Sequence, residues 1–178
     1  MLHFVRISFL RTLPLLLLFA AGCKTENQAL TAYKNYTFDT AVINKLPLYD
    51  SLASAILKNM QLIHAHIHDD DAYHAFRYMP ASTRPEVFKK LPPELGTDID
   101  LYFNQLGKHF IFAFDVFKDS TIKMYVRSRT LETKVDMEEN LSYFPSGRNI
   151  PKREYPLKDT VLNMHWQYWA WFDNQGLF

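Results

Sequence analysis

The residues with the clearest capacity for chemistry lie between positions 63 and 71. This stretch reads Ile63-His64-Ala65-His66-Ile67-His68-Asp69-Asp70-Asp71. Neutral imidazoles and carboxylates are ligands for zinc and similar divalent ions. In a helix, His64 and His68 share a face with Asp71 nearby, whereas in a strand the three histidines align. We therefore treat His64, His68 and Asp71 as a candidate metal site with zinc as the implied cofactor.

The same stretch also has a simpler interpretation, as the solvated end of a helix. The pattern His-Glu-x-x-His is absent from the sequence, and no glutamate lies between the histidines to act as a general base. Three consecutive aspartates near a helix C-terminus oppose the helix dipole, so the helix is expected to end before them. The solvated end is the first interpretation and metal binding the alternative.

Other catalytic patterns give no residue set that can be named. The sequence contains no Gly-x-Ser-x-Gly turn and no glycine-rich phosphate loop. Asp98 and Asp100 carry no sign that they converge. Asp115 is the least ordinary carboxylate because apolar residues surround it, and we expect it to face solvent or Lys123 across a hairpin. The basic loop from Arg148 to Arg153 is expected to be solvated.

A candidate interaction surface lies near the C-terminus, where residues 160–172 alternate as a strand does. One face carries Leu162, Met164, Trp166, Tyr168, Ala170 and Phe172 and is expected to join the core. The opposite face includes His165, Gln167, Trp169 and Trp171, and it is the candidate recognition surface. The alternative is that the two tryptophans lie under a helix or loop.

Helices are expected in the N-terminal half of the domain. Leu52, Ile56, Met60, Ile63 and Ile67 form one stripe at helical spacing, which predicts a helix over residues 48–68. A shorter helical or irregular stretch is expected at 40–46. A second long helix is predicted over 94–106, with Gly107 as its C-terminal stop.

Strands are expected at 73–79, 110–117, 121–129, 135–143 and 160–172. The segment 110–117 is apolar on both faces, as in a central strand, and residues 118–120 form a short turn into the next strand. The fold class predicted is α+β, with N-terminal helices packed on a mainly antiparallel sheet built from the C-terminal half.

The N-terminus has the order of a secretory signal. Arg6 and Arg11 precede an apolar run, and Phe19-Ala20-Ala21-Gly22-Cys23 follows it. This segment resembles the lipobox of bacterial lipoproteins, although Ala20 stands where that family prefers leucine. The resemblance implies that Cys23 is acylated with chains such as palmitate, becomes the first residue after cleavage and holds the protein to the bilayer.

The resemblance covers this segment alone and implies a signal peptide at 1–22. Residues 24–38 are polar and lack a clear period, so we expect a lipidated tether at 23–38 and, from the length that remains, one globular domain at 39–178. Because Cys23 is the only cysteine, no thiol remains for a disulfide or for catalysis. Without Arg6 and Arg11, 18 of the 20 basic residues remain against 19 acidic ones, a formal charge of −1. Such neutrality argues against a nucleic-acid partner.

Three functions remain open on the sequence alone. The first is a non-enzymatic module in the bacterial cell envelope or periplasm, anchored to the inner or outer membrane, that binds an envelope protein or a small-molecule ligand. The second is a metal-binding envelope protein that uses the residues from His64 to Asp71. The third is an enzyme of unidentified class.

Overall fold

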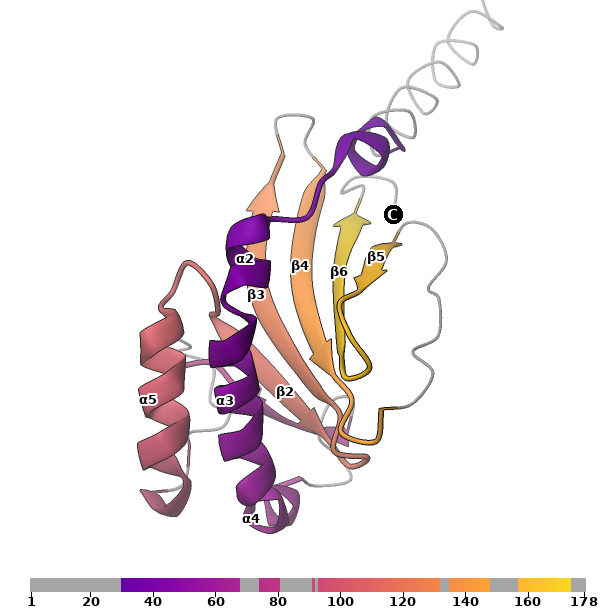
Figure 1. Ribbon diagram of the computed structural model, residues 1–178. Helices are drawn as coiled ribbons and strands as arrows, with labels where there is room; N and C mark the ends of the chain where they lie inside the picture. Colours follow the sequence, from indigo (N-terminus) through magenta and orange to yellow (C-terminus); the bar gives the residue numbers. More distant parts are fainter. Residues whose placement is uncertain are drawn as a thin grey trace, which may run out of the picture.

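A six-stranded antiparallel sheet and the helices on one of its faces make up the described part of the protein. The computed structural model describes residues 30–67, 74–80, 91, 93–131, 135–147 and 157–173. Its strand order is β1-β2-β3-β4-β6-β5, and α3 and α5 lie side by side in front of the sheet (Figure 1). This arrangement confirms the predicted α+β class. No helix within the described ranges is long and apolar enough to cross a bilayer.

The described helices largely follow the predicted stripes. They are α2 (Thr40–Asn44), α3 (Leu46–Lys58), α4 (Met60–Ala65) and α5 (Gly96–Leu106), and a 3-10 turn, η2 (Pro93–Leu95), leads into α5. The Asp39 carboxylate accepts a hydrogen bond from the Ala41 amide and caps α2. Gly107 ends α5 at a φ of 74°, a conformation that glycine adopts without strain.

The prediction of one continuous helix over 48–68 was wrong. The chain leaves helical geometry at Asn59, which separates α3 from α4. The Asn59 side chain donates to the carbonyl of Ala55 one turn earlier, so it competes with the backbone for that acceptor. The apolar stripe continues through the break, because Ile56 and Ile63 are both fully buried.

The strands are β1 (Ala75–Tyr78), β2 (Ala113–Phe117), β3 (Ile122–Thr130), β4 (Asp136–Tyr143), β5 (Leu157–Val161) and β6 (Trp166–Asp173). Four of them lie within one residue of, or inside, the predicted ranges. The single strand predicted over 160–172 is instead the end of β5, a turn and most of β6. Asn163 closes this turn, because its side-chain oxygen accepts hydrogen bonds from the amides of His165 and Trp166.

The main core lies between the helices and the sheet face turned toward them. Phe114, Met124, Leu141, Trp166 and Tyr168 from the strands meet Leu52, Ile56, Ile99 and Phe103 from the helices. Burying a leucine or isoleucine side chain stabilises the fold by about 1.5–3 kcal/mol. The alternation on β6 thus buries Trp166, Tyr168, Ala170 and Phe172 of the face predicted to join the core, whereas Met164, in the turn before β6, is 67% exposed.

Folded structure begins earlier than the predicted domain start at residue 39. Residues 30–35 are helical, and Tyr36 packs edge-on against Phe172 with ring centroids 5.4 Å apart. The Lys158 ammonium donates to the carbonyl oxygens of Tyr33 and Tyr36. Aromatic side chains in this segment therefore cover the end of β6, and the part of the predicted tether from residue 30 onward belongs to the domain.

Candidate functional site

The sheet face turned away from the helices carries a continuous row of polar side chains. Strand pairing sets Arg77 opposite Asp115, Asp115 opposite Lys123, Lys123 opposite Ser142, and Ser142 opposite Gln167. Directly opposed residues in a sheet point to the same face. The row therefore crosses β1, β2, β3, β4 and β6, and we call this side of the sheet the open face.

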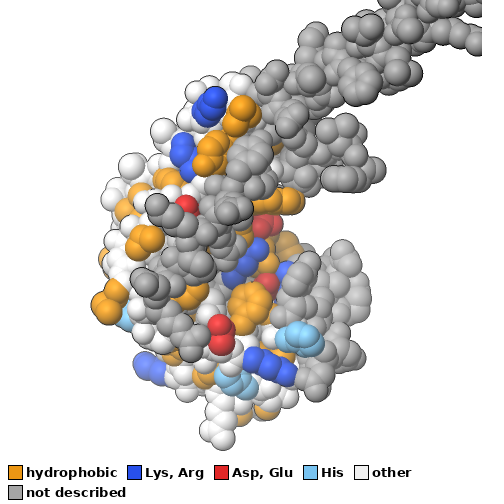
Figure 2. All heavy atoms as spheres, turned by 90° about the vertical axis from the view of Figure 1, so that its right-hand side faces the viewer, with side chains coloured by type: hydrophobic (Ala, Val, Ile, Leu, Met, Phe, Trp, Pro, Cys, Tyr) orange, Lys and Arg blue, Asp and Glu red, His pale blue; other side chains and the backbone are white. Residues whose placement is uncertain are grey.

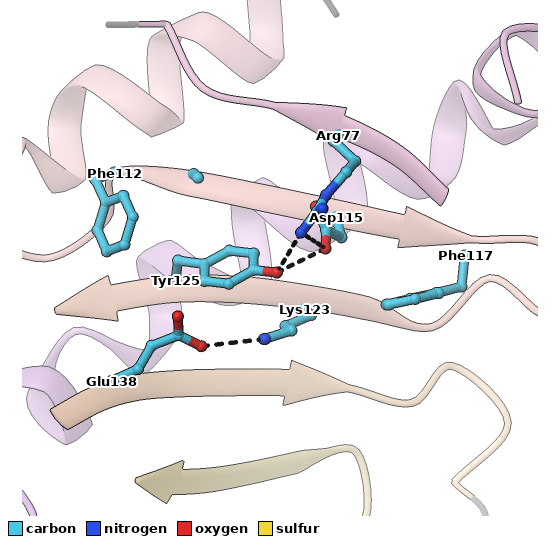
Figure 3. Close-up of a pocket in the computed structure, with 8 residues that line it drawn as sticks. Arg77, Phe112, Asp115, Phe117, Lys123, Tyr125 and Glu138 are labelled. Atoms are coloured by element: carbon cyan, nitrogen blue, oxygen red, sulfur yellow. Dashed lines mark hydrogen bonds and ion pairs between the residues drawn. The ribbon is translucent and has the colours of Figure 1, made fainter. Parts of the chain in front are cut away.

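A cavity of about 450 Å³ lies on the open face. Its lining residues are Arg77, Phe112, Ala113, Asp115, Phe117, Lys123, Tyr125 and Glu138. In Figure 3 these side chains project from β1 to β4 toward the viewer while the helices lie behind the sheet. Pockets of roughly 300–1,000 Å³ with apolar walls and a few fixed polar groups are typical of small-molecule sites.

Arg77, Asp115 and Tyr125 form the most buried polar cluster in the cavity wall. Arg77 Nε and Nη2 donate to the two Asp115 oxygens at 3.0 and 3.1 Å. The Tyr125 hydroxyl donates to Asp115 Oδ2 at 2.7 Å and accepts from Arg77 Nη2 at 2.9 Å. Only 2% of Asp115 is exposed, so these hydrogen bonds replace water around its carboxylate.

Burial and this carboxylate shift the acid–base properties of its neighbours. Burial raises the pKa of the Tyr125 hydroxyl, and the negative charge of Asp115 raises it further. Burial acts to lower the pKa of Arg77, but the Asp115 hydrogen bond and charge outweigh it and the net shift is upward. Both groups therefore stay protonated and serve as hydrogen-bond donors.

Lys123 and Glu138 form a second ion pair with looser surroundings. Lys123 Nζ lies 3.2 Å from Glu138 Oε1, which also accepts a hydrogen bond from Asn140 Nδ2 at 3.0 Å. The ammonium sits 4.1 Å from the ring centroid of Tyr125 and 4.8 Å from that of Trp169. Burial lowers the pKa of Lys123, while Glu138 opposes the shift.

The expectation for Asp115 was half right. Lys123 does lie opposite Asp115 across the β2–β3 hairpin. However, Asp115 is buried rather than solvated, because Arg77 reaches it from β1. The signals in the sequence were a lone acid in one apolar strand and a lone arginine in the short apolar strand before it. The two side chains meet only because β1 pairs with β2, two strands separated by a long stretch of chain.

The predicted recognition surface is only partly open. Trp171 is 38% exposed, but Trp169 is 5% exposed and Gln167 is fully buried. Trp169 donates to Ser142 Oγ and lies beside Lys123, whereas Gln167 donates to Asp159 on β5. These neighbours on the same face cover the two side chains, which corrects the expectation of an exposed aromatic patch.

His165, the fourth residue of that predicted surface, is half-buried in the β5–β6 turn. Its ring stacks on Tyr143 at 5.6 Å, and its Nδ1 lies 2.9 Å from the carbonyl oxygen of Phe144.

Figure 2, viewed from the side of β5, shows basic, acidic and hydrophobic side chains next to one another rather than in separate patches.

The predicted metal site lies largely beyond the described ranges. His64 is near the end of α4, and its Nε2 atom is buried with no hydrogen-bond partner among the described residues. His68 and Asp71 lie outside the described residues, as does the predicted lipidation site Cys23. Within the described ranges, no three His, Cys, Asp or Glu side chains are grouped to hold a metal ion.

Comparisons with known proteins give no relative from which a function could be proposed, so the cavity is interpreted from its own geometry. No protein-family model, no curated protein and no solved structure matches this chain.

Proposed function

We propose that this protein is a small-molecule-binding module of the bacterial cell envelope, anchored through lipid on Cys23. The observation that carries the proposal is the open-face cavity, whose volume of about 450 Å³ suits a small ligand. Its walls combine aromatic rings with charged groups that hydrogen bonds hold in place. Fixed polar groups orient a ligand at little entropic cost, which favours recognition.

The anchor part of the proposal rests on the lipobox-like segment Phe19–Cys23. Seven peptide steps separate Cys23 from residue 30, where the described fold begins. A fully extended chain spans at most about 3.5 Å per residue, so a lipidated Cys23 would hold the domain within about 25 Å of the bilayer surface. A Cys23→Ser variant is expected to leave the membrane fraction. Wild-type protein whose Cys23 shows no acyl mass by mass spectrometry would contradict the anchor.

A thermal-shift screen of purified full-length protein in detergent tests the binding function. Ala113 lines the cavity and is 2% exposed, so Ala113→Leu fills space that a ligand needs. We expect compounds that raise the melting temperature of the wild type and lose this effect with Ala113→Leu. A broad polar and aromatic library without a single compound of this kind, or with hits unaffected by Ala113→Leu, would overturn the proposal.

Zinc binding is a second candidate, favoured by the orphaned Nε2 of His64. A buried imidazole nitrogen without a hydrogen bond is free to coordinate an ion. We expect zinc to raise the melting temperature of the wild type and not that of His64→Ala. Equal shifts in both proteins, or none in either, would remove this candidate.

A further inference from the structure

The charged side chains of the cavity balance one another. Arg77 and Lys123 supply two positive charges, and Asp115 and Glu138 supply two negative ones. A ligand with a net charge would bring an uncompensated charge into a partly desolvated site, which is unfavourable. The cavity therefore favours a ligand that is neutral overall.

The two ion pairs differ in how much hydrogen-bonding capacity they retain. Asp115 already accepts three hydrogen bonds, from Arg77 Nε and Nη2 and from Tyr125. Lys123 has three N–H donors, of which one is used toward Glu138. Among the described residues, none donates to Glu138 Oε2, and in Figure 3 the Glu138 oxygen that is not paired with Lys123 points to the other side.

The Lys123–Glu138 pair thus offers a donor and an acceptor side by side. Both side chains keep access to the cavity, with 20% of Lys123 and 30% of Glu138 exposed. The pair is therefore the part of the cavity best equipped to hold a ligand's polar groups.

Aromatic rings form the remaining walls. Phe112 and Tyr125 lie with their ring centroids 5.8 Å apart and tilted by 50°, and Phe117 closes another side. A flat apolar group packed against such rings gains both burial and aromatic contact. An aromatic ring is the ligand moiety that fits these walls.

From these features we infer that the cavity binds a free aromatic α-amino acid, with its carboxylate at Lys123, its ammonium at Glu138 and its ring against Phe112 and Tyr125. The inference rests on the proposed binding function and gives it a substrate class. In an α-amino acid, the amino nitrogen and the nearer carboxylate oxygen are separated by Cα and the carboxyl carbon and lie roughly 3 Å apart. Lys123 Nζ and Glu138 Oε1 are 3.2 Å apart, so the zwitterionic ligand can lie beside this ion pair with opposite charges adjacent.

Isothermal titration with four related probes tests the inference on full-length protein in detergent. L-phenylalanine is the zwitterion, N-acetyl-L-phenylalanine the anion, L-phenylalaninamide the cation and N-acetyl-L-phenylalaninamide the neutral form. Each charge-assisted hydrogen bond is expected to contribute about tenfold or more in affinity. L-phenylalanine is expected to bind tightest of the four, and the doubly blocked form weakest.

Two variants assign the ligand's charges to side chains. Glu138→Gln is expected to remove the advantage of L-phenylalanine over its N-acetyl derivative, and Lys123→Gln its advantage over the amide. Glu138→Gln keeps the side-chain length, and Lys123→Gln is shorter by one bond but keeps a hydrogen-bond donor. Lys58→Gln, on an exposed helix residue, is the matched control and is expected to bind like the wild type. Circular dichroism melting confirms that each variant is folded.

The outcomes separate this inference from the proposed function. Equal binding of the four probes, tightest binding of the anion, no binding of any probe, or unchanged selectivity in both variants would overturn the amino-acid ligand. If the library screen still gives hits that Ala113→Leu abolishes, the binding function stands with another ligand class. If the screen gives no such hits, both the amino-acid ligand and the binding function are overturned.

Discussion

Each face of the sheet carries a cluster of charged residues around one buried carboxylate, Glu139 on one face and Asp115 on the other, and the surroundings of the two clusters differ. On the helix-covered face, Arg127 lies 2.7 Å from Asp39 and 3.6 Å from Glu139. The Glu139 carboxylate also accepts a hydrogen bond from the Tyr168 hydroxyl. On the open face, the Arg77, Asp115 and Tyr125 cluster and the Lys123–Glu138 pair border a cavity. Ion pairs and tyrosine hydrogen bonds thus occur on both faces, but within the described ranges only those on the open face border the cavity that could hold a ligand.

The N-terminal segment accounts for the difference. Asp39 caps α2 and pairs with Arg127 of β3, while Lys158 of β5 holds the backbone at Tyr36. These contacts tie residues 30–39 to the helix-covered face. The charged groups there have partners from the chain itself, whereas Lys123 and Glu138 retain capacity for partners from outside.

Asp115→Ala is expected to have the largest effect on stability. It leaves the Arg77 guanidinium, 16% exposed, without its carboxylate, and breaking such a buried pair costs about 3–5 kcal/mol. Glu138→Gln is the control on the same face and is expected to cost less than about 1 kcal/mol, because its pair is more exposed. Urea unfolding measures both. Equal losses would show that the two ion pairs do not differ as described.

Tyr36→Ala tests whether the N-terminal segment closes the helix-covered face. Removing a buried aromatic ring costs about 3 kcal/mol, and this ring contacts both Phe38 and Phe172. Trp171→Ala, which removes a larger but partly exposed ring on the other face of β6, is expected to cost about 1 kcal/mol or less. The same unfolding assay compares them, and the reverse order would contradict the role of the segment.

Enlarging a small buried residue on each face tests the difference in packing. Ala170 is fully buried against Tyr36 and Phe172, so Ala170→Leu is expected to destabilise the fold by about 1–3 kcal/mol through overpacking. Ala113 lines the cavity although it is only 2% exposed, so Ala113→Leu is expected to destabilise the fold less than Ala170→Leu does. A large loss with Ala113→Leu would mean that the cavity cannot accept added atoms.

The smallest expected effect is a pH dependence from Asp39. The hydrogen bond from Arg127 lowers the pKa of this carboxyl, helped by the amide of Ala41. Its stabilisation is therefore present above the unfolded pKa of about 4 and is lost as pH falls through the lower folded value. Asp39→Asn keeps a good helix cap and is expected to cost at most about 1 kcal/mol at pH 7 and nothing in strong acid. A difference independent of pH would assign the effect to the cap instead.

Periodicity alone predicted the elements that local pattern determines. The stripe ending at Gly107 predicted α5, and the alternation around residues 118–120 predicted the β2–β3 hairpin. Periodicity missed the breaks at Asn59 and Asn163, because apolar spacing continues through both while the asparagine side chains bond the backbone locally.

The cavity was harder to predict from sequence than the fold. Asp115 was recognised as unusual, but its partner Arg77 lies 38 residues earlier and reaches it only because β1 pairs with β2. Trp169 was assigned to a candidate recognition face, with burial under a helix or loop as the alternative, since strand alternation identifies a face but not what its neighbours cover. Such a site depends on register between distant strands, which the spacing within one strand does not encode.

The most direct measurement follows the indole N–H signals of the three tryptophans by NMR during titration with L-phenylalanine. All three lie on β6: Trp169 beside Lys123 on the open face, Trp166 bonded to Asp50 on the helix-covered face, and Trp171 half-exposed. We expect the Trp169 signal to shift and saturate while that of Trp166 stays unchanged, and Ala113→Leu to abolish the shift. An unmoved Trp169 signal, or a saturable shift of Trp166 instead, would contradict a ligand site on the open face.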